Sequence, residues 1–108
     1  MSIKRIWHGW TTPENADAYQ ELLHKEIFPG IEAKAIRGYR CVEVFRRNLG
    51  QEVEFMTLMT FDSMDDVIEF TGKDYAKSYV PDSARKLLDR WDKEAVHFES
   101  VEKRVQQL

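Results

Sequence analysis

Residues 52–71 read EVEFMTLMTFDSMDDVIEFT, and this stretch decides the fold. Successive side chains of a strand point to opposite faces, so Phe55 and Met59 would share one face while Met56 and Leu58 share the other. Large apolar side chains on both faces indicate a strand that is covered on both sides. The first half of the stretch therefore predicts a strand at the centre of a sheet.

The second half of the stretch predicts a helix that follows the strand directly. Ser63 can cap this helix, and Asp66 stands three residues later, in the position of a capping box. Carboxylates near the start of a helix also interact favourably with its dipole. Val67, Ile68 and Phe70 would form the buried side of this helix.

Two further strands are predicted before this stretch. Residues 3–10 are apolar on both faces, whereas residues 39–47 carry more charge and fit a strand nearer an edge of the sheet. A turn at residues 48–50 makes residues 39–61 a hairpin.

The remaining segments complete an alternating pattern. Thr12 and Pro13 indicate the start of a helix that ends near residue 29. A third helix is expected over residues 81–91, with Ala84, Leu87, Leu88 and Trp91 on one side, and residues 95–101 read as the last strand.

This order of elements predicts one α+β domain over residues 1–108, of the ferredoxin-like split βαβ type. Right-handed crossovers would place the helices on one face of a four-stranded antiparallel sheet. The other face would expose large apolar side chains, which predicts a partner. The simplest partner is a second copy, giving a homodimer that packs through its sheet faces.

Composition excludes several classes of function. Sixteen basic and nineteen acidic residues leave a net charge of −3, so we expect no nucleic-acid partner. Cys41 is the only cysteine, which excludes an intrachain disulfide and a thiolate zinc cluster. No apolar run is long enough for a membrane span or a signal peptide, so we expect a cytoplasmic protein without a membrane partner.

Several segments resemble the dimeric α/β-barrel superfamily: Met-Thr-Phe-Asp-Ser at residues 59–63, Asp74-Tyr75, and Pro-Asp-Ser-Ala-Arg at residues 81–85. Nearly the whole chain is most similar to the antibiotic-biosynthesis-monooxygenase-like branch. The superfamily includes cofactor-independent quinol oxygenases, haem-degrading oxygenases, muconolactone isomerases and small stress proteins. The resemblance implies a dimeric α/β barrel with a ligand between the sheet and the helices of each subunit.

The resemblance does not extend to the catalytic pattern of the haem-degrading members. Those proteins use an Asn on the first strand, a Trp in the helix after the third strand, and a His shortly afterwards. Here the matching places carry Trp7-His8, Phe70 and Val80. We therefore expect neither haem nor another tightly held cofactor.

Two histidines are the candidate catalytic residues. His8 shares a strand face with Ile6 and Trp10, and a neutral imidazole there could accept a proton from a substrate. The alternative is a histidine that is hydrogen-bonded within the core or a dimer interface. His97 lies on the last strand, beside the first, so the two side chains could meet or line opposite faces. No spacing of carboxylates supports a metal, and we expect none.

Aromatic side chains are the candidate substrate contacts. Tyr75 and Tyr79 flank an irregular segment beside Phe70 and could form the lid of a pocket, and Trp10 could stack on a substrate. Ordinary packing is the alternative for all four. Arg5, inside an apolar strand, is expected to pair with Glu43 or Glu99 across the sheet, or else to bind a substrate carboxylate.

The predicted function is that of a small enzyme of the monooxygenase-like branch. It would bind a small aromatic or quinol-like molecule, with His8 or His97 as the base. One alternative is a non-catalytic small-molecule-binding or stress-response dimer. Another is an isomerase or a dehalogenase-like enzyme on the same fold.

Overall fold

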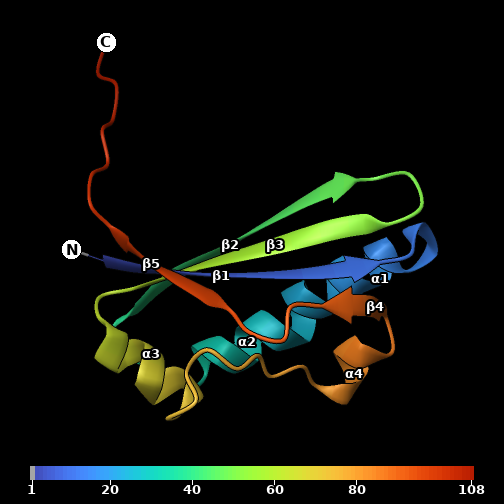
Figure 1. The fold of residues 1–108 in the computed structure, drawn as a ribbon, viewed down its shortest axis with the longest axis horizontal. Coiled ribbons are helices and arrows are strands. Elements are labelled where there is room, and N and C mark those ends of the chain that lie inside the picture. The colour runs from blue at the N-terminus through green and yellow to red at the C-terminus, as the bar shows by residue number, and fades with distance from the viewer. Residues whose placement is uncertain (1) are drawn as a thin grey trace.

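The computed structural model describes residues 2–108 and forms one sheet with helices along one of its sides (Figure 1). The elements are β1 (Ser2–Thr11), α1 (Pro13–Leu22), the π-helical turn η1 (Leu23–Ile27), α2 (Phe28–Glu32), β2 (Tyr39–Asn48), β3 (Val53–Phe61), α3 (Met64–Thr71), α4 (Asp82–Arg85), β4 (Leu88–Trp91) and β5 (Val96–Ser100).

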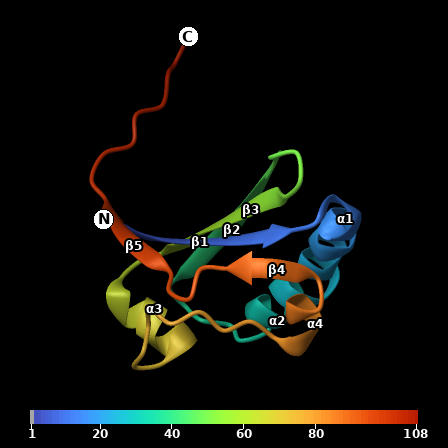
Figure 2. The same ribbon diagram turned by 45° about the vertical axis from the view of Figure 1, so that its right-hand side comes forward.

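The sheet is antiparallel, with β1 and β3 at its centre. β2 pairs with the outer side of β3, and β4 and β5 share the position beside β1. β5 pairs with the first half of β1 and β4 with its end. The predicted ferredoxin-like α+β fold is thus confirmed, with five strands instead of four because the last strand is split. All helices lie on the same side of the sheet in both views (Figures 1 and 2).

The helix predicted over residues 81–91 is wrong beyond its first turn. The structure has a helix only over Asp82–Arg85 and then the strand Leu88–Trp91. The apolar spacing of this segment suits a helix, but the end of β1 offers unpaired backbone groups. Pairing of Gly9 with Trp91 and of Trp10 with Arg90 satisfies those groups, so tertiary context overrides the local pattern.

The core lies between the central strands and the helices. Tyr19 of α1 packs edge-on against Phe55 of β3, with ring centroids 4.9 Å apart, and both side chains are buried. A second cluster surrounds Phe61, which contacts Phe70 of α3. The predicted cap is confirmed, because Ser63 Oγ accepts the Asp66 N–H at 3.3 Å and donates to Asp66 Oδ2 at 2.8 Å.

The side of the sheet that faces away from the helices is called the open face below. Its apolar side chains are Ile6, Phe45, Met56, Leu58, Val96 and Phe98. Phe98 keeps 54% of its surface exposed, and Phe45 and Val96 are also exposed. The predicted apolar character of both faces of the central strands is therefore confirmed, and within a single chain one face remains bare.

The segment of residues 101–108 follows β5 without helix or strand structure. Figures 1 and 2 both show it leaving the body on the side of the sheet opposite the helices. Within residues 2–108, none of the helices combines the length and apolar character that crossing a bilayer requires.

Candidate functional site

The two histidines lie on opposite faces of the sheet. In the pairing of β1 with β5, Arg5 stands opposite His97, and both side chains point toward the helices. His8 lies three residues after Arg5 on β1, so its side chain is on the other side of the sheet, the open face, with Ile6 and Trp10. The two imidazoles therefore belong to separate sites, which the sequence had left open.

Arg5 is the centre of the site on the helix side. Only 7% of its surface is exposed. Its Nη1 group donates hydrogen bonds to the carbonyl oxygen of Tyr75 and, at 2.9 Å, to Nε2 of His97. A guanidinium has no acceptor, so Nε2 of His97 must be the acceptor, and the proton of the neutral imidazole lies on Nδ1.

No carboxylate of residues 2–108 forms an ion pair with Arg5. The expected pairing with Glu43 or Glu99 is wrong. Glu43 stands opposite Leu58, on the open face. Glu99 stands opposite Ile3, two residue pairs along β1 from Arg5, and is exposed. The positive charge of Arg5 is therefore stabilised only by hydrogen bonds to neutral groups, the Tyr75 carbonyl and the His97 ring.

Burial and charge set the protonation of this site. Burial lowers the pKa of Arg5 from its ordinary value, although a guanidinium stays charged at neutral pH. Burial, together with the neighbouring Arg5 charge, lowers the pKa of His97 below its ordinary value of 6.5. His97 is consequently neutral at pH 7 and suited to accept the Arg5 hydrogen bond.

Tyr75 connects this cluster to solvent. Its ring meets the His97 ring edge-on, with centroids 5.4 Å apart and planes at 71°. It also borders a solvent-open hollow of about 370 Å³. That hollow is lined by Lys73, Asp74, Tyr75, Ala76, Lys77 and Glu94. Arg5, His97 and Tyr75 are called the Arg5 site below.

The other predicted substrate contacts lie elsewhere. Phe70 packs in the core against Phe61, under the ammonium group of Lys34. Tyr79 is 88% exposed. Trp10 is on the open face with His8. Among the residues singled out from the sequence, the structure thus brings together Arg5, His97 and Tyr75 on the helix side, and His8 and Trp10 on the open face.

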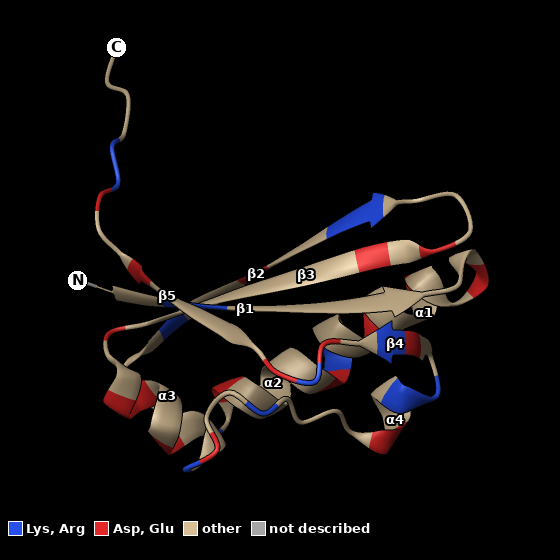
Figure 3. Cartoon of the chain, viewed as in Figure 1, with Lys and Arg blue, Asp and Glu red and all other residues tan. Residues whose placement is uncertain are grey.

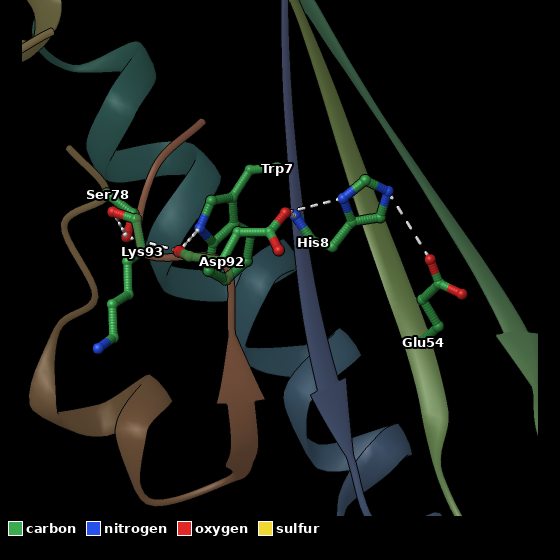
Figure 4. A network of polar contacts seen from close by, with 6 residues as sticks. All are labelled: Trp7, His8, Glu54, Ser78, Asp92 and Lys93. Carbon is green, nitrogen blue, oxygen red and sulfur yellow. Dashed lines mark hydrogen bonds and ion pairs between the residues drawn. The ribbon is translucent and has the colours of Figure 1, made fainter. Parts of the chain in front are cut away.

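His8 is held by the turn that separates β4 from β5 (Figure 4). Its Nδ1 lies 2.9 Å from Asp92 Oδ2, and the same oxygen accepts the His8 backbone N–H at 3.0 Å. Trp7 Nε1 and Ser78 Oγ both donate to the Asp92 carbonyl oxygen at 2.8 Å. His8 Nε2 is 3.7 Å from a Glu54 oxygen. Asp92 therefore fixes the orientation of the His8 ring.

An aromatic and cationic stack continues from His8 along the open face. Trp10 stacks on the His8 ring at 5.9 Å, and the Arg90 guanidinium lies 3.9 Å from the centroid of the Trp10 ring. Arg90 in turn binds Glu52 through two hydrogen bonds.

Asp92 is the central residue of the His8 cluster, and sequence reasoning missed it. Its contact with His8 depends on the break between β4 and β5, where the chain pairs with residues 76–78 instead of β1. No periodic pattern marks that break.

Residues 2–108 contain no group of three or more His, Cys, Asp or Glu side chains arranged to hold a metal ion. Acidic and basic residues are interleaved over the elements (Figure 3).

Comparison with known proteins gives a fold-level result. No protein-family model matches the chain, and no curated protein sequence matches it. Among solved structures, a proposed antibiotic biosynthesis monooxygenase from Bacillus cereus matches with a TM-score of 0.65 at 14% identity, covering 99% of this chain and 100% of its own.

Two other solved structures give the same result. Protein Rv0793 from Mycobacterium tuberculosis matches with a TM-score of 0.62 at 18% identity, over 95% of this chain and 98% of its own. A protein of the EthD family from Bacillus halodurans matches with a TM-score of 0.57 at 23% identity, over 94% of this chain and 100% of its own. These likenesses confirm the predicted resemblance at the level of fold: the chain has the α+β fold of the antibiotic-biosynthesis-monooxygenase-like structures.

Proposed function

We propose that the protein binds a small aromatic molecule carrying an oxyanion, a carboxylate or a phenolate, at the Arg5 site between the sheet and the helices. The observation that carries this proposal is a buried guanidinium whose partners are both neutral. Taking a cation out of water costs several kcal/mol, and two neutral acceptors offset only part of that cost. Residues held at such a cost are concentrated at functional sites.

The surroundings of Arg5 suit an aromatic ligand. The Tyr75 and His97 rings supply flat apolar surfaces, and ligand rings pack edge-on or offset against such surfaces. The adjoining hollow of about 370 Å³ lies within the usual range of small-molecule pockets, roughly 300–1,000 Å³. Tyr75 belongs both to the Arg5 site and to the lining of the hollow, so a ring in the hollow would contact the site through Tyr75.

The proposed reaction is oxygenation of a quinol without a cofactor. A ligand oxyanion that takes over the Arg5 hydrogen bonds frees the His97 Nε2 lone pair to accept a phenol proton. The electron-rich quinolate then reacts with O₂, forming a C–O bond at a ring carbon. The products are a hydroxyquinone and water, because oxidation of the quinol to the quinone supplies the two electrons that reduce the second oxygen atom.

The proposal includes a second copy packed on the open face. This copy would cover the exposed Phe45, Val96 and Phe98 side chains. Burial of such a patch is the main driving force for association. The cluster of His8 and Trp10 would then lie in the dimer interface, and the Arg5 site would remain on the helix side of each subunit.

A second candidate is a binding protein without chemistry. The observation in its favour is that the His97 Nε2 lone pair is occupied by Arg5, which leaves no free base in the unliganded site. An isomerase or dehalogenase-like activity would use the same guanidinium to hold a carboxylate product. Oxygen consumption separates all of these from the oxygenase.

The test measures O₂ uptake by the purified protein with 2,5-dihydroxybenzoate, a quinol that carries a carboxylate. The proposal predicts O₂ uptake. With ¹⁸O₂ as the gas, one ¹⁸O atom is expected in each molecule of the hydroxyquinone product. Arg5→Met is expected to abolish both, whereas His24→Gln, on an exposed turn, should leave both unchanged. Binding of this compound without uptake would favour the non-catalytic candidate.

A further inference from the structure

Arg5 has hydrogen-bond donors that the contacts described so far do not use. A guanidinium donates from Nε, Nη1 and Nη2. Both hydrogen bonds of Arg5, to the Tyr75 carbonyl oxygen and to His97 Nε2, come from Nη1. Among residues 2–108, no acceptor is bonded to Nε or Nη2, although Arg5 is only 7% exposed. The edge of the guanidinium that Nε and Nη2 form is called the free edge below.

The free edge is not sealed inside the protein. Within residues 2–108, Thr11 Oγ1 is the one side-chain nitrogen or oxygen that is both fully enclosed and without a hydrogen-bond partner. Because Nε and Nη2 of Arg5 also lack a partner, solvent must reach them despite the burial of the residue. Buried polar groups are usually hydrogen-bonded, so donors left unused in this way require an explanation. They are open to an acceptor from outside the chain.

Two other arginines of the protein show what this edge binds. Nε and Nη2 of Arg40 donate to the two carboxylate oxygens of Asp62. Nε and Nη2 of Arg90 donate to those of Glu52, at 3.2 and 3.0 Å. Parallel N–H groups of a guanidinium match the two oxygens of a carboxylate in spacing and direction. The free edge of Arg5 has the same donors and, within the described part of the chain, no such acceptor.

We propose that the ligand of the Arg5 site is an aromatic carboxylate whose two oxygens accept hydrogen bonds from Nε and Nη2 of Arg5. This inference rests on the proposed function and narrows its ligand from either kind of oxyanion to a carboxylate. A phenolate offers a single oxygen and cannot use both donors in parallel, so it binds more weakly. The bonds of Nη1 to Tyr75 and His97 fix the plane of the guanidinium and so present the free edge to the ligand.

The nitrogens of the guanidinium thus have separate roles. The free edge holds the carboxylate, and this contact leaves the bonds of Nη1 in place. Nη1 remains the group whose bonds a phenol oxygen of the same ligand takes over in the proposed reaction, which releases His97 Nε2. A ring that carries both a carboxylate and phenol groups, such as 2,5-dihydroxybenzoate, meets both requirements.

The experiment compares 4-nitrobenzoate with 4-nitrophenolate by calorimetric titration, at a mildly alkaline pH where both compounds are anions. They share a nitrophenyl ring and a single negative charge, and differ in the number of anionic oxygens. The wild-type protein should bind the carboxylate at least about tenfold more tightly, since only the carboxylate makes the second charged hydrogen bond. Arg5→Lys keeps the charge and removes the parallel donors, so the preference should fall below about threefold. The matched control Arg40→Lys, at an exposed arginine, should keep the preference.

A second readout uses the wild-type protein and so does not depend on the folding of a variant. NMR of the ¹⁵N-labelled protein follows the Arg5 Nε–H group, and 4-nitrobenzoate should move its proton resonance downfield as the new hydrogen bond forms. Equal affinity for the two compounds, or binding of 4-nitrobenzoate with an unmoved Nε–H resonance, overturns the carboxylate assignment. The proposed function then survives where Arg5→Met still abolishes binding. A wild-type protein that binds neither compound overturns the proposed function together with this inference.

Discussion

Replacing Arg5 with Met tests whether this residue is present for binding or for stability. The substitution keeps a long apolar side chain in the buried position and removes the charge. It deletes two hydrogen bonds from a charged donor, worth about 1.5–3 kcal/mol each, or about 3–6 kcal/mol together. It also removes the desolvation penalty of the buried cation, which is several kcal/mol.

These two contributions oppose each other and are of similar size. The acceptors left behind, the Tyr75 carbonyl and His97 Nε2, belong to residues that are not fully buried and can bind water instead. We therefore expect Arg5→Met to change the free energy of unfolding by no more than about 1 kcal/mol in either direction. A structural arginine paired with a buried carboxylate would lose about 3–5 kcal/mol on the same change.

The assay is urea denaturation at neutral pH, followed by tryptophan fluorescence. Arg40→Met is the control, because Arg40 is exposed and its ion pair with Asp62 is expected to contribute little to stability. A loss of more than about 3 kcal/mol in Arg5→Met would refute the reasoning, since it would make Arg5 a structural residue.

Three further predictions concern local contacts. Because the pKa of His97 is lowered in the folded state, the unfolded chain binds more protons, so the free energy of unfolding should fall as pH drops from 6.5 toward that lowered pKa. Urea denaturation of His97→Gln should lack this part of the pH dependence, and a profile equal to that of the wild-type protein would contradict the prediction. Ser63→Ala removes the helix cap and should cost about 1 kcal/mol in thermal or urea unfolding; a neutral result would mean that the cap is dispensable. Gly38→Ala would push a methyl group into the Asp66 carboxylate, so it should destabilise the protein at least as much as the cap variant, and an equally stable variant would count against this packing.

The central strands could be predicted from the sequence because their pattern is strong and local. Phe55 and Met56 are both large and apolar, and only a strand buried on two sides needs such neighbours. The cap at Ser63 was predictable for the same reason, since a capping box is contained in four residues. The bare open face followed from the topology.

The split of the last strand could not be predicted in this way. Leu88 and Trp91 recur at helical spacing, and their strand conformation depends on pairing with β1, far away in the chain. The contact of Asp92 with His8 depends on that split and was missed with it.

The Arg5 site was predictable only in its parts. His97 and Tyr75 could be singled out as polar groups on otherwise apolar elements, and Arg5 as a charge within a strand. Their meeting depends on the register that sets Arg5 opposite His97, and a shift of one residue would have put the guanidinium on the open face. That register is a property of the folded sheet.

The most direct test of the central claim is calorimetric titration of the protein with 2,5-dihydroxybenzoate and with hydroquinone, which share a quinol ring and differ by a carboxylate. The account predicts that the carboxylate compound binds more tightly to the wild-type protein. It also predicts that Arg5→Met loses this preference while Arg40→Met keeps it. Equal affinity of the wild-type protein for the two compounds, or an undiminished preference in Arg5→Met, would contradict the assignment of Arg5 as the anion-binding residue.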